Sequence, residues 1–235
     1  MPKVAEKRRD PAIHADEPNA AVTSGQFCLT FVPFGLGMVA AIWYPEASQD
    51  LRLFRTIYTI RVSMLLAMPG LALFFFRNRS PAMRNVWALF WTFSFLAFFI
   101  HMLYGLFGVF GGQVETARLH PENYRVTNDA TALDLLMAHQ GRPVAWSILI
   151  IIGVWLVDVL IAWRGRKAAG GLRRAFDVFH ALNWLYVLIS FLVAAILFAK
   201  NPTILAMGWT MVGTVAFAIV LRLICPTPEL ARTVS

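Results

Sequence analysis

Runs of about twenty apolar residues recur along this chain and constrain its fold more than any other feature. A helix of that length crosses the hydrocarbon core of a bilayer, which is about 30 Å thick. Of the 235 residues, 58% are hydrophobic and 14% are charged, whereas soluble domains carry about 25% charged residues. The sequence therefore predicts an all-α fold, a polytopic transmembrane helical bundle. Six segments qualify as spans: 27–44, 56–76, 86–110, 143–163, 176–199 and 203–221.

The charges outside these spans predict how the bundle is oriented. With the N-terminus inside, fourteen basic and six acidic residues fall on the cytoplasmic side, and the outer segments carry six of each. This imbalance follows the positive-inside rule and accounts for the net charge of +8 without nucleic acid as a partner. We therefore expect a polar cytoplasmic tail (1–24), a six-span membrane domain (25–222) and a cytoplasmic C-terminal tail (223–235), with both termini inside. The expected location is a bacterial inner membrane.

The connection between the third and fourth spans is the longest one and lies on the outer side. Its second half, residues 128–140, predicts a short interfacial helix folded over the bundle. Asn128 or Asp129 can cap its start, and one face is apolar, formed by Leu133, Leu136 and Met137.

Polar residues at membrane depth are costly and are therefore the first candidates for function. On the inner side, Asp158 and His180 lie roughly 6–8 Å deep on the fourth and fifth spans, at about 1.5 Å per residue. A short loop makes these two helices antiparallel neighbours, and Asn183 lies one turn further on. A carboxylate beside an imidazole is the arrangement of a proton relay, and equally that of a structural ion pair. We weigh the structural role more heavily, because intramembrane pairs commonly serve packing.

A second candidate group lies towards the outer side of the predicted bundle. Arg61 is about 8–9 Å inside the second span, at the depth of Tyr104 in the third, and its long side chain can reach the headgroups. His101 lies one turn deeper than Tyr104 on the same helical face, and is too deep to reach water easily. His101 is therefore the best single candidate for a functional residue. His139 can approach it only if the outer loop folds inward.

Cofactors are weakly indicated by the sequence. Haem b needs axial ligands, and the pair His101 and His139 is the one that the sequence offers. The aromatic third span has a surface that a quinone, a pigment or plain lipid can contact. No metal site is expected, because no recognised ligand spacing occurs, and Cys28 and Cys225 are expected to be small apolar filler. Glycines at 105, 108, 111 and 112 predict a flat stripe where another helix packs.

The sequence carries no recognised catalytic motif, so no enzyme activity can be assigned. The expected function is that of an integral membrane subunit or accessory factor, non-catalytic, within a larger membrane assembly. Its expected partners are the lipid bilayer and other membrane subunits, and nucleic acid is not among them. Two alternatives remain open. One is a redox membrane subunit that binds haem b or quinone, and the other is a small proton-linked transporter or channel.

Overall fold

Six long helices make up the part of the chain that the computed structural model describes, which is residues 21–44, 51–109, 141–165, 170–197 and 202–225. No strand occurs within these ranges. The all-helical prediction is therefore confirmed. The helices are α1 (Ser24–Trp43), α2 (Leu51–Leu73), α3 (Pro81–Leu103), α6 (Gly141–Arg164), α7 (Gly170–Leu192) and α8 (Pro202–Ile224). Helices α3 and α7 continue into π-helical turns, at Tyr104–Val109 and Val193–Leu197.

Five of these helices, namely α1, α2, α3, α7 and α8, are long and apolar enough to cross a membrane. The chain thus has the helices of a multi-pass membrane protein. Helix α6 has 24 residues but is not among the five, so the sixth span stays a prediction. The expected interfacial helix at 128–140 and the terminal tails at 1–20 and 226–235 lie outside the described residues.

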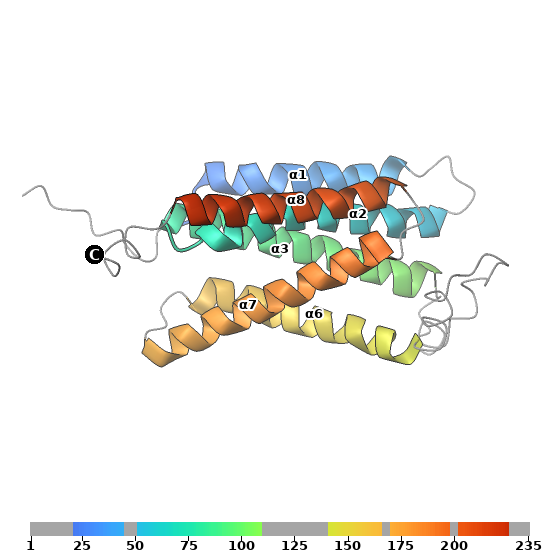
Figure 1. The fold of residues 1–235 in the computed structure, drawn as a ribbon. Coiled ribbons are helices and arrows are strands. Elements are labelled where there is room, and N and C mark those ends of the chain that lie inside the picture. The colour runs from blue at the N-terminus through green and yellow to red at the C-terminus, as the bar shows by residue number, and fades with distance from the viewer. Residues whose placement is uncertain (1–20, 45–50, 110–140, 166–169, 198–201, 226–235) are drawn as a thin grey trace, which may run out of the picture.

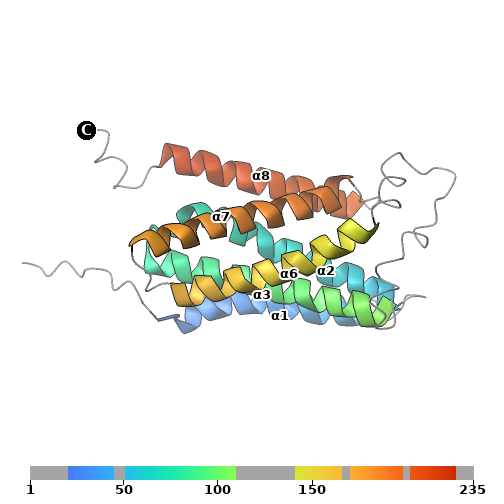
Figure 2. The same cartoon turned by 90° about the horizontal axis from the view of Figure 1, so that it is seen from below.

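The helices run antiparallel in chain order and lie roughly side by side (Figures 1 and 2). Helices α2 and α3 make the closest pair, α1 packs against both, α8 packs against α2, and α6 packs against α3 and α7. The start of α1, the turn between α2 and α3, the start of α7 and the end of α8 all lie at one end. We call it the basic end, since seven of the arginines with described side chains lie towards it: Arg77, Arg79, Arg84, Arg164, Arg173, Arg174 and Arg222.

Capping residues explain why two helices begin earlier than the apolar pattern indicates. Thr23 accepts a hydrogen bond from the backbone of Gln26, whose side chain in turn accepts one from the backbone of Thr23. This capping box starts α1 three residues before the expected position. Ser80 caps α3 by accepting a hydrogen bond from the backbone N–H of Met83, with Pro81 at the first helical position. Helix α1 also remains one continuous helix across Pro33.

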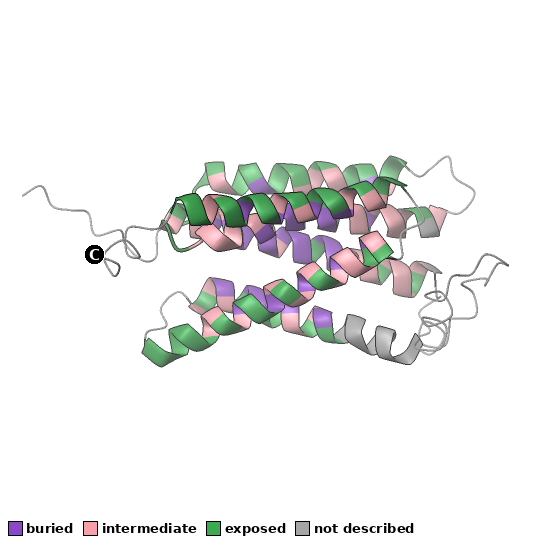
Figure 3. Cartoon of the chain, in the orientation of Figure 1, coloured by how far each residue is buried: buried purple, intermediate pink, exposed green. Residues whose placement is uncertain are grey.

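Aromatic side chains fill the space between α3, α6 and α7. Trp155 is fully buried and its ring lies 5.0 Å from that of Trp91 and 5.6 Å from that of Phe98. Phe191 completes this group from α7, at 6.0 Å from Trp155. Burial is concentrated on the surfaces that the helices turn towards one another (Figure 3), and the outward faces remain apolar and exposed, as lipid contact requires. This packing holds α6 and α7 against the central pair.

Gly208 lets α8 approach the π-helical turn at the end of α7 closely, and this contact offers a test of the packing. A methyl group added there would lie 2.8 Å from Ile196 and 3.0 Å from the Cβ of Ala195. We predict that Gly208→Ala lowers the free energy of unfolding by about 1–3 kcal/mol, the usual cost of overpacking, measured by thermal unfolding in detergent.

The matched control is Gly213→Ala on the same helix, where an added methyl group meets no atom within 4 Å. This variant should be neutral, or gain up to about 1 kcal/mol from the better helix propensity of alanine. Equal stability of the two variants would contradict the close contact of Gly208 with Ala195 and Ile196.

Candidate active site at the basic end

A single carboxylate, Asp158, joins three helices inside the bundle. Asp158 is fully buried on α6. Its Oδ1 lies 2.5 Å from Nδ1 of His180, and its Oδ2 accepts hydrogen bonds from Nδ2 of Asn183 at 2.9 Å and from Nε1 of Trp91 at 2.7 Å. An ionised carboxylate offers acceptors alone, so three donors can converge on it. The structure thus brings together the three residues of the inner cluster and adds Trp91.

His180 connects this buried group to a small cavity. The imidazole is 8% exposed and packs edge-on against Trp87, with 5.3 Å between ring centroids. Since Nδ1 is used by Asp158, Nε2 is the ring nitrogen left for the cavity, which has a volume of about 60 Å³ and is lined by His180. That volume holds up to about four water molecules at about 15 Å³ each. A carboxylate that fixes one nitrogen of an imidazole leaves the other free to accept or donate a proton.

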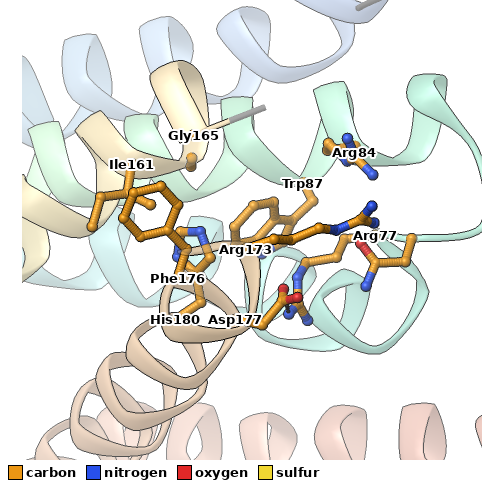
Figure 4. A pocket seen from close by; sticks show the side chains of 11 residues that line it. Arg77, Arg84, Trp87, Ile161, Gly165, Arg173, Phe176, Asp177 and His180 are labelled. Atoms are coloured by element: carbon orange, nitrogen blue, oxygen red, sulfur yellow. Dashed lines mark hydrogen bonds and ion pairs between the residues drawn. The ribbon is translucent and has the colours of Figure 1, made fainter. Parts of the chain in front are cut away.

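The rim of the cavity is strongly basic. Figure 4 shows Arg77, Arg84 and Arg173 arranged around it, with Asp177 beside Arg77. Arg77 donates hydrogen bonds to Asp177 at 2.9 Å and to the carbonyl of Phe74 at 2.8 Å. Burial lowers the pKa of the Arg77 guanidinium, while the hydrogen bond and charge of Asp177 oppose that change. Arg77 is therefore held in place as a paired cation at the edge of the cavity.

The outer candidates do not form a comparable cluster. Nδ1 of His101 lies 2.8 Å from the carbonyl oxygen of Thr56, and the guanidinium of Arg61 lies 4.7 Å from the ring centre of Tyr58. Within the described residues, no hydrogen bond or ring contact joins Arg61, His101 and Tyr104 to one another. Tyr104 begins the π-helical turn, and His139 lies outside the described residues.

The two described histidines cannot share a haem iron. His180 packs on Trp87, and His101 lies fourteen residues further along α3. At about 1.5 Å per residue that separation is about 21 Å. Within the described ranges, no three side chains of the metal-binding types gather into a site.

The chain was also compared with known proteins. No protein-family model, no curated protein and no solved structure matches it. The site is therefore interpreted from its own geometry alone.

Several residues of the site are missed by sequence reasoning. The apolar pattern places Trp91 on an aromatic surface that a quinone, a pigment or plain lipid can contact, and the arginines are interpreted only as charges that set the orientation. One signal was available for Trp91, because a buried indole N–H usually finds an acceptor and Asp158 lies at a similar depth. The glycine spacing predicts a stripe for another helix, and Gly105 lies against Thr56 of α2 within this chain.

Removing the carboxylate should destabilise the bundle strongly. Asp158→Ala leaves His180, Asn183 and Trp91 without their common acceptor, and breaking a buried ionic group costs about 3–5 kcal/mol. Asp158→Asn keeps one acceptor oxygen and should lose less. Thermal unfolding of the detergent-purified protein measures both.

Ser94→Ala is the control variant, because it removes one hydrogen bond between uncharged groups inside the bundle. Ser94 and Ser63 are buried and exchange hydrogen bonds of 2.9 Å between α2 and α3, so its loss should cost about 1 kcal/mol. If Asp158→Ala were no less stable than Ser94→Ala, the carboxylate would not join the three helices.

Proposed function

We propose that this protein is a proton-linked membrane protein, a small transporter or channel, in which His180 and Asp158 together bind the proton. The observation that carries this proposal is the position of His180, with Nδ1 held by a fully buried carboxylate and Nε2 left to a cavity. The cavity is lined at its rim by the exposed residues Asn78 and Arg173. A proton entering from that end therefore meets the imidazole first.

The chemistry of each group fits this role. Imidazole is the side chain whose charge changes near neutral pH. When Nε2 takes up a proton, the ring becomes a cation beside the carboxylate of Asp158, which compensates its charge inside the membrane. Asn183 and Trp91 hold that carboxylate from the other side. Within the described residues, the acceptor Oδ1 of Asn183 is buried without a hydrogen-bond partner. It can therefore accept a hydrogen bond from a water molecule that enters the site when His180 is protonated.

Proton movement can be measured directly in proteoliposomes that contain a pH-sensitive dye. We expect the unmodified protein to dissipate an imposed pH gradient. His180→Gln and Asp158→Asn should reduce the rate to that of empty liposomes, because neither variant retains the imidazole–carboxylate pair.

Ser94→Ala is the matched control, since it changes a buried polar contact outside the cluster and should retain the flux. Circular dichroism and thermal unfolding establish that each variant is folded. A folded His180→Gln variant with unchanged flux would overturn the proposal and leave the ion pair with a structural role.

We further propose that the protein spans a bacterial inner membrane six times, with both termini on the cytoplasmic side, and serves as a subunit or accessory factor of a larger assembly. The asymmetry of charge supports the orientation, because the basic end carries most of the described arginines. The exposure of helices α1 and α8 supports the proposal that the protein belongs to an assembly. Their predicted spans are 17% and 22% buried, against 50% for α2 and α3, so most of their apolar surface remains available to a neighbouring subunit or to lipid.

Blue-native electrophoresis of gently solubilised native membranes tests the assembly. We expect the 26.4 kDa chain to migrate within a larger complex that contains other polypeptides. Migration as a monomer or small homo-oligomer would contradict the subunit proposal and leave the proton-linked function intact.

A further inference from the structure

We infer that the basic end carries a binding site for an anionic phospholipid, with the phosphate in the arginine-lined cavity and an acyl chain in an adjoining apolar groove between α6 and α7. This inference goes beyond proton exchange and does not depend on it. It rests on three observations: two arginines without an ion-pair partner and a buried indole N–H without an acceptor, both within the described part of the chain, and an apolar groove that shares a wall with the cavity.

Two of the three cavity arginines lack an ion-pair partner within the described residues, although the charge of Asp177 attracts Arg84 more weakly than Arg173 repels it. Arg77 is paired with Asp177, but neither Arg84 nor Arg173 forms an ion pair within the described part of the chain. Arg84 and Arg173 are close enough to repel each other. Arg84 and Arg173 also lie in the first turns of α3 and α7, where the helix dipole disfavours cations and favours anions. An anion in the cavity would relieve both costs.

Trp87 supplies the second observation. Its side chain is 3% exposed and lines the cavity, and its indole Nε1 has no hydrogen-bond partner among the residues that the structure describes. Buried donors are nearly always satisfied by protein, water or a ligand. A phosphate has four oxygens, each of which can accept, and occupies about the room of the few waters that the cavity holds. Together with Arg84 and Arg173, Trp87 can therefore donate to one phosphate group.

The apolar lining of the neighbouring groove indicates that the phosphate belongs to a lipid with an acyl chain. It has a volume of about 370 Å³, and besides Arg164 its lining is almost wholly apolar, including Val157, Leu160 and Leu172. Ile161, Gly165 and Phe176 line both the groove and the cavity, so the two adjoin. Figure 4 shows Phe176 and Ile161 beside the arginine cluster. A charged pocket joined to an apolar groove between helices fits an anionic lipid, whose headgroup lies at the membrane surface.

Native mass spectrometry of the full-length protein in detergent tests the headgroup part. We expect phosphatidylglycerol to bind more tightly than phosphatidylcholine, whose choline would meet the arginines. Arg84→Gln and Arg173→Gln should each weaken phosphatidylglycerol binding about tenfold, the usual effect of losing a charge-assisted hydrogen bond.

Arg174→Gln is the matched control, because Arg174 is the exposed neighbour of Arg173 and does not line the cavity. It lowers the net charge equally and should leave binding unchanged. Equal weakening by Arg173→Gln and Arg174→Gln, or equal binding of the two lipids, would overturn the inference, since the arginines would then act through general charge alone.

Two further measurements test the acyl-chain part. Leu160→Trp should fill the groove and weaken lipid binding severalfold, whereas Leu156→Trp, one turn earlier on the exposed face and outside the groove, should not. Inorganic phosphate should bind far more weakly than the lipid. If inorganic phosphate bound as tightly, or if the two tryptophan variants behaved alike, the ligand would be a free phosphate and the lipid assignment would be wrong.

Discussion

The carboxylate of Asp158 must be satisfied away from water, and the arrangement of three helices follows from that requirement. Transferring an ion out of water costs several kcal/mol, which only donors in good geometry can offset. Those donors come from Trp91 on α3 and from His180 and Asn183 on α7. A helix rotates about 100° per residue, so a shift of one residue in either neighbour would withdraw its donor. One polar group therefore fixes the register of α3, α6 and α7 at the same point.

The aromatic packing depends on the same register. Trp91 donates to Asp158 and also contacts the ring of Trp155, which in turn packs on Phe98 and Phe191. Dispersion contacts of this kind are not directional enough to choose one register. The polar contact chooses it, and the aromatic rings then pack around it between α3, α6 and α7. Lipid offers no hydrophobic drive for helix association, so both contributions are needed in a membrane bundle.

Sequence reasoning could predict what depends on length and depth. The bilayer sets the span length, so the helices were found, and a short loop with equal depths placed Asp158 beside His180. Sequence reasoning could not predict features that depend on the direction in which a side chain points around its helix axis. Nothing in a linear count shows that Arg84 and Arg173 face one cavity, or that the indole of Trp91 points inward. The helical spacing of His101 and Tyr104 is retained, because Tyr104 has αR backbone angles and its N–H bonds to the carbonyls of Ile100 and His101. Spacing alone could not show that the imidazole of His101 lies against the carbonyl oxygen of Thr56 on α2.

The two ends of the bundle differ in whether polar groups with unused donors come together at one cavity. A ligand site needs donors or acceptors that the fold itself does not use. Towards the end opposite the basic one, His101 is bonded to a backbone carbonyl and Arg61 lies over an aromatic ring of its own helix. The Nε of Arg61 is also buried without a hydrogen-bond partner in the described part of the chain, but no hydrogen bond or ring contact there joins Arg61 to His101. At the basic end, Arg84 and Arg173 form no ion pair and the indole N–H of Trp87 has no acceptor within the described residues, and all three residues line one cavity. The polar contacts that join α3, α6 and α7 at Asp158 do not use these groups, so their convergence on one cavity fits the anionic phospholipid inferred above better than a role in stability.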